Sequence, residues 1–313
     1  HTAPRRARPD AGQETVNADR LLATGLVQEW VPLGPLTTYK AGGPARLFAA
    51  IGDTGQLEAL VGSGLAADLD ILVLGRGSNL VVADEGFDGL VIQLGGQFSR
   101  VWVDDMEVGA GGAAPLARVA RTAVEAGRLG LEFFVGIPGS VGGAVRQNAG
   151  CFGVETADRL LDAELMDVRT GVRRTADPAG LDLSYRHSNV AGVEVVLTAR
   201  FRGEPGDVAV GKTRMREITR WRKEHQPGGT LNAGSVFKNP EGATAGELID
   251  RLGLKGTSVG SVSVSAKHAN FFVAGPGATA SDVLALVRQV KDTVFERTGT
   301  MLEPEIQFVG FEE

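Results

Sequence analysis

GIPGSVGGAVRQNAGCFG, residues 136–153, is the stretch around which the chain is organised. It holds six glycines and one proline, and it follows the apolar segment Leu131–Val135. Glycine is needed where the backbone takes a positive φ or must approach a ligand more closely than a Cβ atom allows. Glycines spaced closely around Ser140 therefore predict a loop whose N–H groups surround an anion such as a pyrophosphate. The alternative is an ordinary glycine-rich connection, in which Asn148 merely tolerates a left-handed turn.

The bulk composition is that of a globular protein. With 313 residues, the chain is long enough for two or three domains with a substantial core. Its net charge of −6 argues against a general nucleic-acid-binding surface. No apolar run reaches the roughly 20 residues that a bilayer-spanning helix needs, so we expect no membrane insertion. The single cysteine, Cys151, excludes an internal disulfide framework and fits a reducing compartment, so we expect a cytoplasmic protein.

The expected organisation is a tail followed by three units. Residues 1–20 are polar, rich in Pro and Arg, and contain no apolar segment typical of a signal peptide, so they predict a disordered tail. Changes in pattern then divide the chain into residues 21–98, 99–205 and 206–313. In the first unit we expect strands 45–51, 70–74, 80–82 and 89–94, a helix around Leu57–Leu65, and a second glycine-bearing loop, GRGSN, at 75–79.

The second unit contains a possible dinucleotide fingerprint. Residues 109–114, GAGGAA, match GxGxxA, but a Rossmann site would need an acidic residue at the end of a second parallel strand about 20 residues later. A helix over 115–126 and the central loop follow instead, so a strand-to-helix turn is the better interpretation. The other expected strands of this unit are 101–103, 107–109, 163–168, 172–175 and 193–201.

The third unit begins with a charged helix over 207–223. Helices over 245–252 and 279–296 follow, with strands 261–264 and 270–273 between them, and the last helix has a clear apolar stripe and a capping pair, Thr279 with Asp282. We expect a final strand, 305–309, to close a small sandwich within this unit.

Three polar stretches do not fit a core or an ordinary surface: Tyr185–Ser188, Asn232–Pro240 and Leu302–Glu305. An arginine held near an apolar site offers a fixed fork for a carboxylate or phosphate. A serine hydrolase is disfavoured because the chain has no GxSxG elbow. The scattered histidines and the one cysteine have no metal-binding spacing, so we expect no metal.

Six motifs together resemble a known family. In chain order they are LGRGSNL, GIPGSVGGAVRQNAG, YRHS, NAGSVFKNP, KHANFFV and LEPEIQFVG. This order resembles the flavin-dependent UDP-N-acetylenolpyruvoylglucosamine reductases of peptidoglycan synthesis, over roughly Thr37–Gly310. The resemblance implies an α+β fold: a two-subdomain FAD-binding module of the vanillyl-alcohol-oxidase type, followed by a small α/β substrate-binding domain.

The resemblance also implies non-covalently bound FAD, with NADPH as co-substrate. No side chain can deliver a hydride, and in this family reduced FAD passes one from N5 to UDP-N-acetylglucosamine enolpyruvate, giving UDP-N-acetylmuramate. The FAD pyrophosphate is expected among the backbone amides of the two glycine-rich loops. The residues assigned to FAD are Gly75, Gly77, Ser78, Asn79, Gly136, Ile137, Gly139, Ser140, Gly142, Gly143 and Asn148.

Three residues match the family's catalytic positions. Arg186 is expected to stabilise the negative charge that develops next to the substrate carboxylate. Glu305 is expected to hydrogen-bond that carboxylate or support the enol, in its protonated form if burial allows. Ser235 is expected to protonate the carbanion, helped by a nearby positive charge that Lys238 could supply. Less securely matched substrate contacts are Tyr185, Lys238, Asn239 and Asn270.

Two departures from the family pattern set limits on the match. Many members have Arg where this chain has Gln307, so a second substrate-directed charge would come from Lys267 or the 214–223 helix. The interval between Arg200 and Ser235 carries no tyrosine-bearing insertion, and this indicates the compact subgroup of the family.

Two other function classes remain as alternatives. The first is an oxidase or dehydrogenase on the same flavin scaffold, although GRGSN lacks the His or Cys needed for covalent flavin attachment. The second is a catalytically silent nucleotide-binding protein, which has no need of Arg186, Ser235 and Glu305 together. The expected partners are a UDP-sugar and NADPH, with no nucleic acid, and we expect a monomer.

Overall fold

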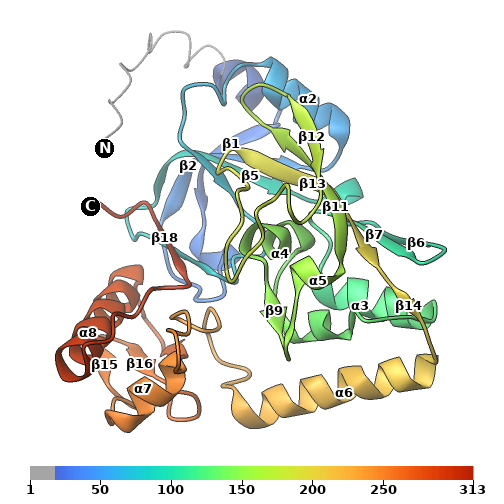
Figure 1. Ribbon diagram of the computed structural model, residues 1–313. Helices are drawn as coiled ribbons and strands as arrows, with labels where there is room; N and C mark the ends of the chain where they lie inside the picture. The colour runs from blue at the N-terminus through green and yellow to red at the C-terminus, as the bar shows by residue number, and fades with distance from the viewer. Residues whose placement is uncertain (1–17, 313) are drawn as a thin grey trace.

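Residues 18–312 are described by the computed structural model, in which the chain folds into three units (Figure 1). The predicted tail falls almost wholly on residues outside the described part. In the first unit, β2 (Pro44–Ile51), β5 (Phe87–Leu94) and β3 (Ile71–Val73) pair in parallel, and β1 (Val27–Pro32) pairs antiparallel with β2. Helix α2 (Thr54–Gly62) packs on this sheet through Leu57 and Leu60. The β-α-β order predicted for this unit is therefore confirmed.

The second unit is an antiparallel sheet against which helices pack. Strand β7 (Glu107–Gly111) pairs antiparallel with both its neighbours, β6 (Val101–Asp104) and β13 (Glu194–Arg202), so the GAGGAA segment belongs to no parallel Rossmann unit. Helix α3 (Leu116–Glu125) follows it and buries its apolar face in the core of this unit. The sheet order is β12 (Arg173–Ala176), β11 (Leu160–Asp167), β13 (Glu194–Arg202), β7 and β6 (Val101–Asp104).

Helix α6 (Val208–His225) runs beneath the second unit toward the third (Figure 1). Gly211 lies so close to the second unit that an added Cβ would be 2.7 Å from Leu129 and from Val124 side-chain atoms. Ile218, also on α6, is buried. Because the helix packs on the second unit, we propose that the third unit begins after α6 and not at residue 206.

The third unit is a small sheet covered by two helices. Its strands are β15 (Ser258–Val259), β16 (Val262–Val264) and β17 (Phe272–Ala274), and its helices are α7 (Ala245–Arg251) and α8 (Ala280–Thr298). The stripe predicted for α8 is buried, and the Thr279–Asp282 capping box is present. Both predictions for this helix are confirmed.

The prediction that the last strand closes this sheet is wrong. Strand β18 (Gln307–Val309) pairs in parallel with β4 (Leu80–Val82) of the first unit. The free edge of β17 is already occupied, because Leu231 bridges Ala274 and Ser235 bridges Phe271. The chain therefore leaves the third unit and returns to the first at Glu305.

Residues 18–23 are helical, and the other short elements are η1 (Gly34–Leu36), η2 (Gly96–Ser99), β8 (Arg128–Leu129), η3 (Glu132–Gly136), α4 (Val141–Gln147), β9 (Gly150–Cys151), β10 (Val154–Glu155), α5 (Thr156–Arg159) and β14 (Glu204–Pro205). Among residues 18–312, no helix combines the length and the apolar character required to cross a bilayer. The same residues contain no group of three or more His, Cys, Asp or Glu side chains placed to hold a metal ion.

Candidate active site

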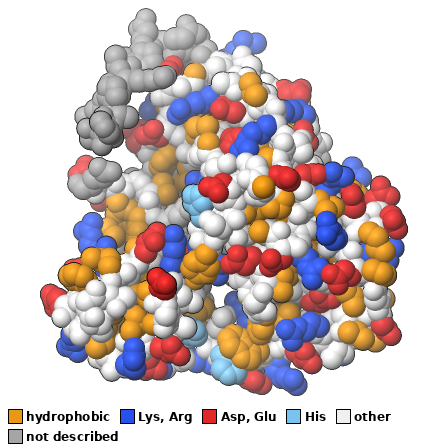
Figure 2. Space-filling view, viewed as in Figure 1, with side chains coloured by type: hydrophobic (Ala, Val, Ile, Leu, Met, Phe, Trp, Pro, Cys, Tyr) orange, Lys and Arg blue, Asp and Glu red, His pale blue; other side chains and the backbone are white. Residues whose placement is uncertain are grey.

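A cavity of about 330 Å³ lies where the three units meet. It is lined by both glycine-rich loops and by Arg186, Ser235 and Glu305. A second cavity, of about 390 Å³, shares residues 73–76, Ser140 and Arg146 with the first. Figure 2 shows a hollow in the surface between the third unit and the C-terminal end of α6. The two cavities together can hold an elongated ligand that passes both loops.

The first loop, residues 75–79, is shaped by glycine. Gly77 has φ +60, and an added Cβ would lie 2.3 Å from the carbonyl oxygen of Leu36. At Gly75 an added Cβ would lie 2.7 Å from Ser140 Oγ, so the two loops are in close contact. The amides of residues 75–78 donate no hydrogen bond to any residue between 18 and 312. Amides without protein partners at a cavity wall fit an anionic ligand.

The second loop leads into α4, and only part of its backbone is available. Ser140 Oγ caps the helix by accepting a 3.4 Å hydrogen bond from the amide of Gly143. The amide of Gly142 donates to the Gly112 carbonyl at 2.7 Å, so it is already engaged. An added Cβ at Gly142 would lie 3.2 Å from the same oxygen, which gives this glycine a packing role. The N–H groups of Gly139 and Ser140 donate no hydrogen bond within the described chain, so they can still donate to a ligand.

Asn148 ends α4 in the left-handed conformation, as predicted, with φ 42. Its side chain is buried and fully used by protein: Nδ2 donates to Glu155 Oε2 at 2.8 Å and to the Ser184 carbonyl at 2.9 Å. Its Oδ1 accepts from the Ala157 amide at 2.9 Å. Asn148 is not among the residues that line either cavity, so its side chain holds the loop in place.

The charge of the first cavity favours an anionic cofactor. Four arginines, Arg76, Arg146, Arg186 and Arg222, line the first cavity, against the single carboxylate Glu305. Together with the unbonded loop amides, they can balance the two negative charges of a pyrophosphate. The residues present therefore fit FAD, with the pyrophosphate beside residues 75–78 and Gly139–Ser140.

Arg186 and Glu305 meet across two units of the fold. Arg186 Nε donates to Glu305 Oε1 at 2.8 Å, and both side chains are only 16% exposed. The same guanidinium lies 3.4 Å from Glu155 Oε1 and from the Gly150 carbonyl. Arg186 has φ +54, in a tight turn closed by Ser184 and His187. A backbone conformation that side chains rarely adopt is often found at a functional site.

Glu305 is held where the chain crosses from the third unit to the first. The Asn79 side-chain amide donates to its carbonyl oxygen at 3.0 Å, and the Asn79 carbonyl accepts from the amide of Gln307. Burial raises the pKa of Glu305 above its ordinary value, although the charges of Arg186 and Lys238 oppose this. Burial therefore favours the protonated carboxyl that can donate a hydrogen bond.

Ser235 lines the same cavity as the glycine loops. The loop that carries it is fixed by Asn270, which is buried and binds both backbone groups of Phe237. Asn270 Nδ2 donates to the Phe237 carbonyl at 2.8 Å, and Oδ1 accepts from its amide at 2.9 Å. The side chain predicted to contact substrate is thus engaged in positioning the Ser235 loop.

The three remaining predicted substrate residues lie outside the cavity lining. Lys238 Nζ donates to Glu303 Oε1 at 2.6 Å. Asn239 Oδ1 accepts from the Ala245 amide at 3.1 Å, next to the start of α7. The Tyr185 hydroxyl accepts from the Asn239 amide at 3.2 Å, and the Tyr185 ring lies against the Arg186 guanidinium. In this arrangement Tyr185 joins the second unit to the third.

Arg222, in the last turn of α6, and Gln226, just after it, line the cavity but were not among the predicted site residues; the sequence placed Arg222 only among the charged residues of that helix. Arg222 Nε donates to Gln226 Oε1 at 2.7 Å, and burial lowers the pKa of Arg222. Arg222 follows the buried Ile218 by four residues, so helical spacing places both on the face that packs against protein. Arg214 lies four residues before Ile218 but is exposed, so the structure, and not helical spacing alone, singles out Arg222.

In comparison with known proteins, two family models match separate parts of the chain. A family model described as an FAD binding domain matches residues 45–177. A second model, described as the C-terminal domain of UDP-N-acetylenolpyruvoylglucosamine reductase, matches residues 226–309. The first match supports the predicted flavin-binding fold of the vanillyl-alcohol-oxidase type.

Full-length relatives and a solved structure agree. A UDP-N-acetylenolpyruvoylglucosamine reductase of Erythrobacter litoralis is 41% identical over 287 residues, covering 91% of this chain and 88% of the relative. One from Agathobacter rectalis is 42% identical, covering 93% and 96%. The crystal structure of the Thermus caldophilus reductase superposes with a TM-score of 0.78 at 37% identity, covering 90% of this chain and 98% of the other. The chain belongs to the UDP-N-acetylenolpyruvoylglucosamine reductase family.

Proposed function

We propose that this FAD-dependent oxidoreductase reduces UDP-N-acetylglucosamine enolpyruvate to UDP-N-acetylmuramate, with NADPH as the reductant and with Arg186, Glu305 and Ser235 as its catalytic residues. The observation that carries the proposal is the meeting of these three side chains, from separate segments of the chain, on one cavity beside both glycine loops. Bound FAD supplies the hydride for the terminal carbon of the enolpyruvyl group, after it has taken up electrons from NADPH.

Arg186 stabilises the charge that develops in the reaction. When the terminal carbon gains a hydride, the electron pair of the double bond moves to the adjacent carbon and spreads into the carboxylate. The Arg186 guanidinium is fixed by three acceptors: Glu305 Oε1, Glu155 Oε1 and the Gly150 carbonyl. A cation fixed before the reaction stabilises developing charge without reorganisation.

Glu305 and Ser235 complete the reduction. A protonated Glu305 donates a hydrogen bond to the substrate carboxylate and so supports the enediolate, and its raised pKa favours this form. Ser235 then protonates the carbon next to the carboxylate, which balances the added hydride. Because Lys238 is bound to Glu303 in this structure, the cations nearest this step are those that line the cavity.

Arg222 supplies the second substrate-directed positive charge. Gln307 lines the cavity where many relatives carry arginine, and it brings no charge. Arg222 enters the same cavity from α6, and the described part of the chain contains no carboxylate in a salt bridge with it. A half-buried guanidinium with no carboxylate partner among residues 18–312 is suited to bind an anionic group of the substrate.

The test follows the flavin absorption band through both half-reactions of a Ser235→Ala variant without oxygen. We expect NADPH to bleach the band at close to the wild-type rate, because Ser235 takes no part in that step. Reoxidation by the enolpyruvyl sugar should slow by about 10²-fold or more, the usual contribution of a general acid. Ser263→Ala, at a half-buried serine of β16 outside the cavity, is the matched control. Equal losses in both half-reactions would disprove the proton-donor role of Ser235.

A further inference from the structure

An exposed stack of aromatic rings lies at the end of α6. The Trp221 and His225 rings are parallel to within 13°, with centroids 4.5 Å apart. The ring of Phe152 meets Trp221 edge to face at 5.1 Å. Trp221 is 41% exposed, and Phe152 is 36% exposed. A soluble protein seldom leaves three such rings together at its surface without a binding role.

The stack adjoins the cavity of the proposed active site. Cys151, next to Phe152 in the chain, lines that cavity. Arg222 and Gln226, which precede and follow His225 in the sequence, line it as well. In Figure 2 hydrophobic and histidine side chains gather beside the hollow at this end of α6. A ligand that reaches from the cavity toward solvent along α6 therefore passes over the rings.

The far side of this opening is formed by the third unit. Lys267 Nζ donates to the Lys223 carbonyl at 2.5 Å, which brings the segment after β16 against the end of α6. His268 packs its ring against Phe271 at 4.7 Å, and Phe271 lines the cavity. Burial and the charge of Lys255 lower the pKa of His268, and His225 adds to this effect. Two aromatic pairs thus border the same opening.

Two arginines adjoin the stack, and one of them, Arg214, also pairs with Glu217 at 3.3 Å. The Arg214 guanidinium lies 5.8 Å from the centre of the Phe152 ring, and Arg222 lies between the two stacked residues in sequence. Flat apolar rings bind a heterocyclic base by stacking, and that interaction tolerates any base because each has a π face. Guanidinium groups bind phosphates. Rings and guanidinium groups together match the two ends of a nucleoside diphosphate.

We propose that the Trp221–His225 stack is the subsite for the base of a nucleoside diphosphate, whose phosphates extend past Arg222 into the cavity. The inference rests on the proposed function, because both its substrate, a UDP-sugar, and its reductant, NADPH, carry a base on a diphosphate. Trp221 is then a residue that binds the ligand and takes no part in the chemistry.

The experiment measures binding of UDP, NADP⁺ and inorganic pyrophosphate to the FAD-loaded protein by calorimetry. In Trp221→Leu, which keeps apolar bulk but removes the π face, we expect the Kd of a base-carrying ligand to rise about 5- to 100-fold. Trp221→Phe should stay within about threefold of wild type, because the stacking face is retained. Pyrophosphate, which has no base, should bind equally well to all three proteins.

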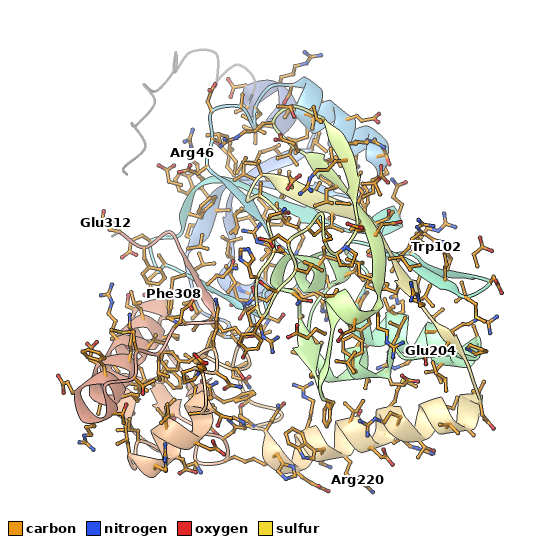
Figure 3. The ribbon with its side chains drawn as sticks, viewed as in Figure 1. Arg46, Trp102, Glu204, Arg220, Phe308 and Glu312 are labelled. Atoms are coloured by element: carbon orange, nitrogen blue, oxygen red, sulfur yellow. The ribbon has the colours of Figure 1, made fainter. Side chains whose placement is uncertain are left out.

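Trp102→Ala is the matched control, since Trp102 is 40% exposed and lies at the β6–β7 hairpin, away from the C-terminal end of α6 (Figure 3). FAD content and circular dichroism establish that each variant is folded. Loss of UDP affinity alone identifies the substrate's uracil as the occupant, and loss of NADP⁺ affinity alone identifies the reductant. Unchanged Kd values for both nucleotides in Trp221→Leu would overturn the proposal.

The outcome for the proposed function is separate. If the wild-type flavin is reoxidised by the enolpyruvyl sugar while Trp221→Leu binds both UDP and NADP⁺ with wild-type Kd values, only the stacking inference fails. If the wild-type flavin is not reoxidised by that sugar, the proposed function fails whatever the Kd values are.

Discussion

Glu305 is the residue on which stability and catalysis make opposite demands. Its carboxyl is buried, and burial raises its pKa despite the neighbouring Arg186. The native protein therefore holds this proton more tightly than the unfolded chain does. Between the unfolded and folded pKa values, stability falls as the pH rises, and above the folded pKa the full cost of the buried charge remains.

Glu305→Gln should therefore raise the melting temperature at neutral and alkaline pH. The amide cannot ionise, and its oxygen can still accept from Arg186. The gain over wild type should shrink as the pH falls through the raised pKa and vanish below the unfolded value. Reoxidation of the flavin by substrate should slow by about 10²-fold or more. Thermal unfolding across pH tests the first part, and a lower melting temperature at pH 8 than wild type would contradict it.

At the residue scale, the sequence predicted which side chains share the site but not which groups they hydrogen-bond. The sequence placed Arg186, Ser235 and Glu305 at one site through the resemblance of their motifs, and all three line one cavity. It could not assign hydrogen-bond partners, because these depend on contacts distant in the chain. Asn270 binds the backbone of Phe237, and Lys238 pairs with Glu303.

Among the elements, the loop of residues 75–79 depends on Gly77. Its φ of +60 is unfavourable for other residues, and an added Cβ would lie 2.3 Å from a backbone oxygen that cannot move aside cheaply. Gly77→Ala should therefore distort the loop and lose most of the FAD. At Gly62, the last residue of α2, an added Cβ meets nothing within 4 Å.

Gly62→Ala is the control for that prediction. It should leave the flavin content unchanged and alter stability by no more than about 1 kcal/mol, in the stabilising direction. The ratio of flavin to protein absorbance after purification measures both variants. A Gly77→Ala protein that retained full FAD would show that the loop's shape is not needed for the cofactor.

Helix α8 is tied to the first unit by Asp84. Its two carboxylate oxygens accept from the amides of Ala280 and Ser281 at 2.8 and 2.9 Å, and from the Ser281 hydroxyl at 2.6 Å. Burial would raise the pKa of Asp84, but these hydrogen bonds lower it overall. A negative charge at a helix N-terminus is stabilising. Asp84 therefore helps to fix the third unit against the first.

Asp84→Asn should lower stability by about 1 kcal/mol or more at pH 7. Because the folded pKa is depressed, this stabilisation is present above the unfolded pKa and is lost as the pH falls through the folded pKa. The gap between wild type and variant in urea unfolding should therefore close in acid. Asp88→Asn, at an 81% exposed side chain, should change stability by less than about 0.5 kcal/mol. A gap that persisted at the lowest pH would refute the charge argument.

Element positions followed from local pattern, whereas strand partners did not. The capped, striped helix α8 and the strand Leu80–Val82 match their predicted spans closely because both signals are local. The partner of β18 was predicted wrongly. Residues 231–235 occupy the edge that β18 was expected to take, and their sequence gives no sign of it.

At the scale of the whole molecule, the site forms only because the chain returns from the third unit to the first. The segment that leads into β18 carries Glu305 back to the first unit, and Phe308 of β18 lies between the first unit and α8 (Figure 3). Arg186 comes from the second unit, and Ser235 comes from the third. This arrangement places the proposed catalytic groups on one cavity, which the two glycine-rich loops also line. No unit alone can supply the site.

The central claim is that this cavity passes electrons from NADPH through FAD to an enolpyruvyl UDP-sugar. The most direct test is the visible spectrum of the FAD-loaded protein during anaerobic addition of NADPH, and then of UDP-N-acetylglucosamine enolpyruvate. The account predicts a flavin band that bleaches with NADPH and returns in full with one equivalent of the sugar. A band that bleaches but does not return would contradict it and would favour an oxidase or dehydrogenase on the same scaffold.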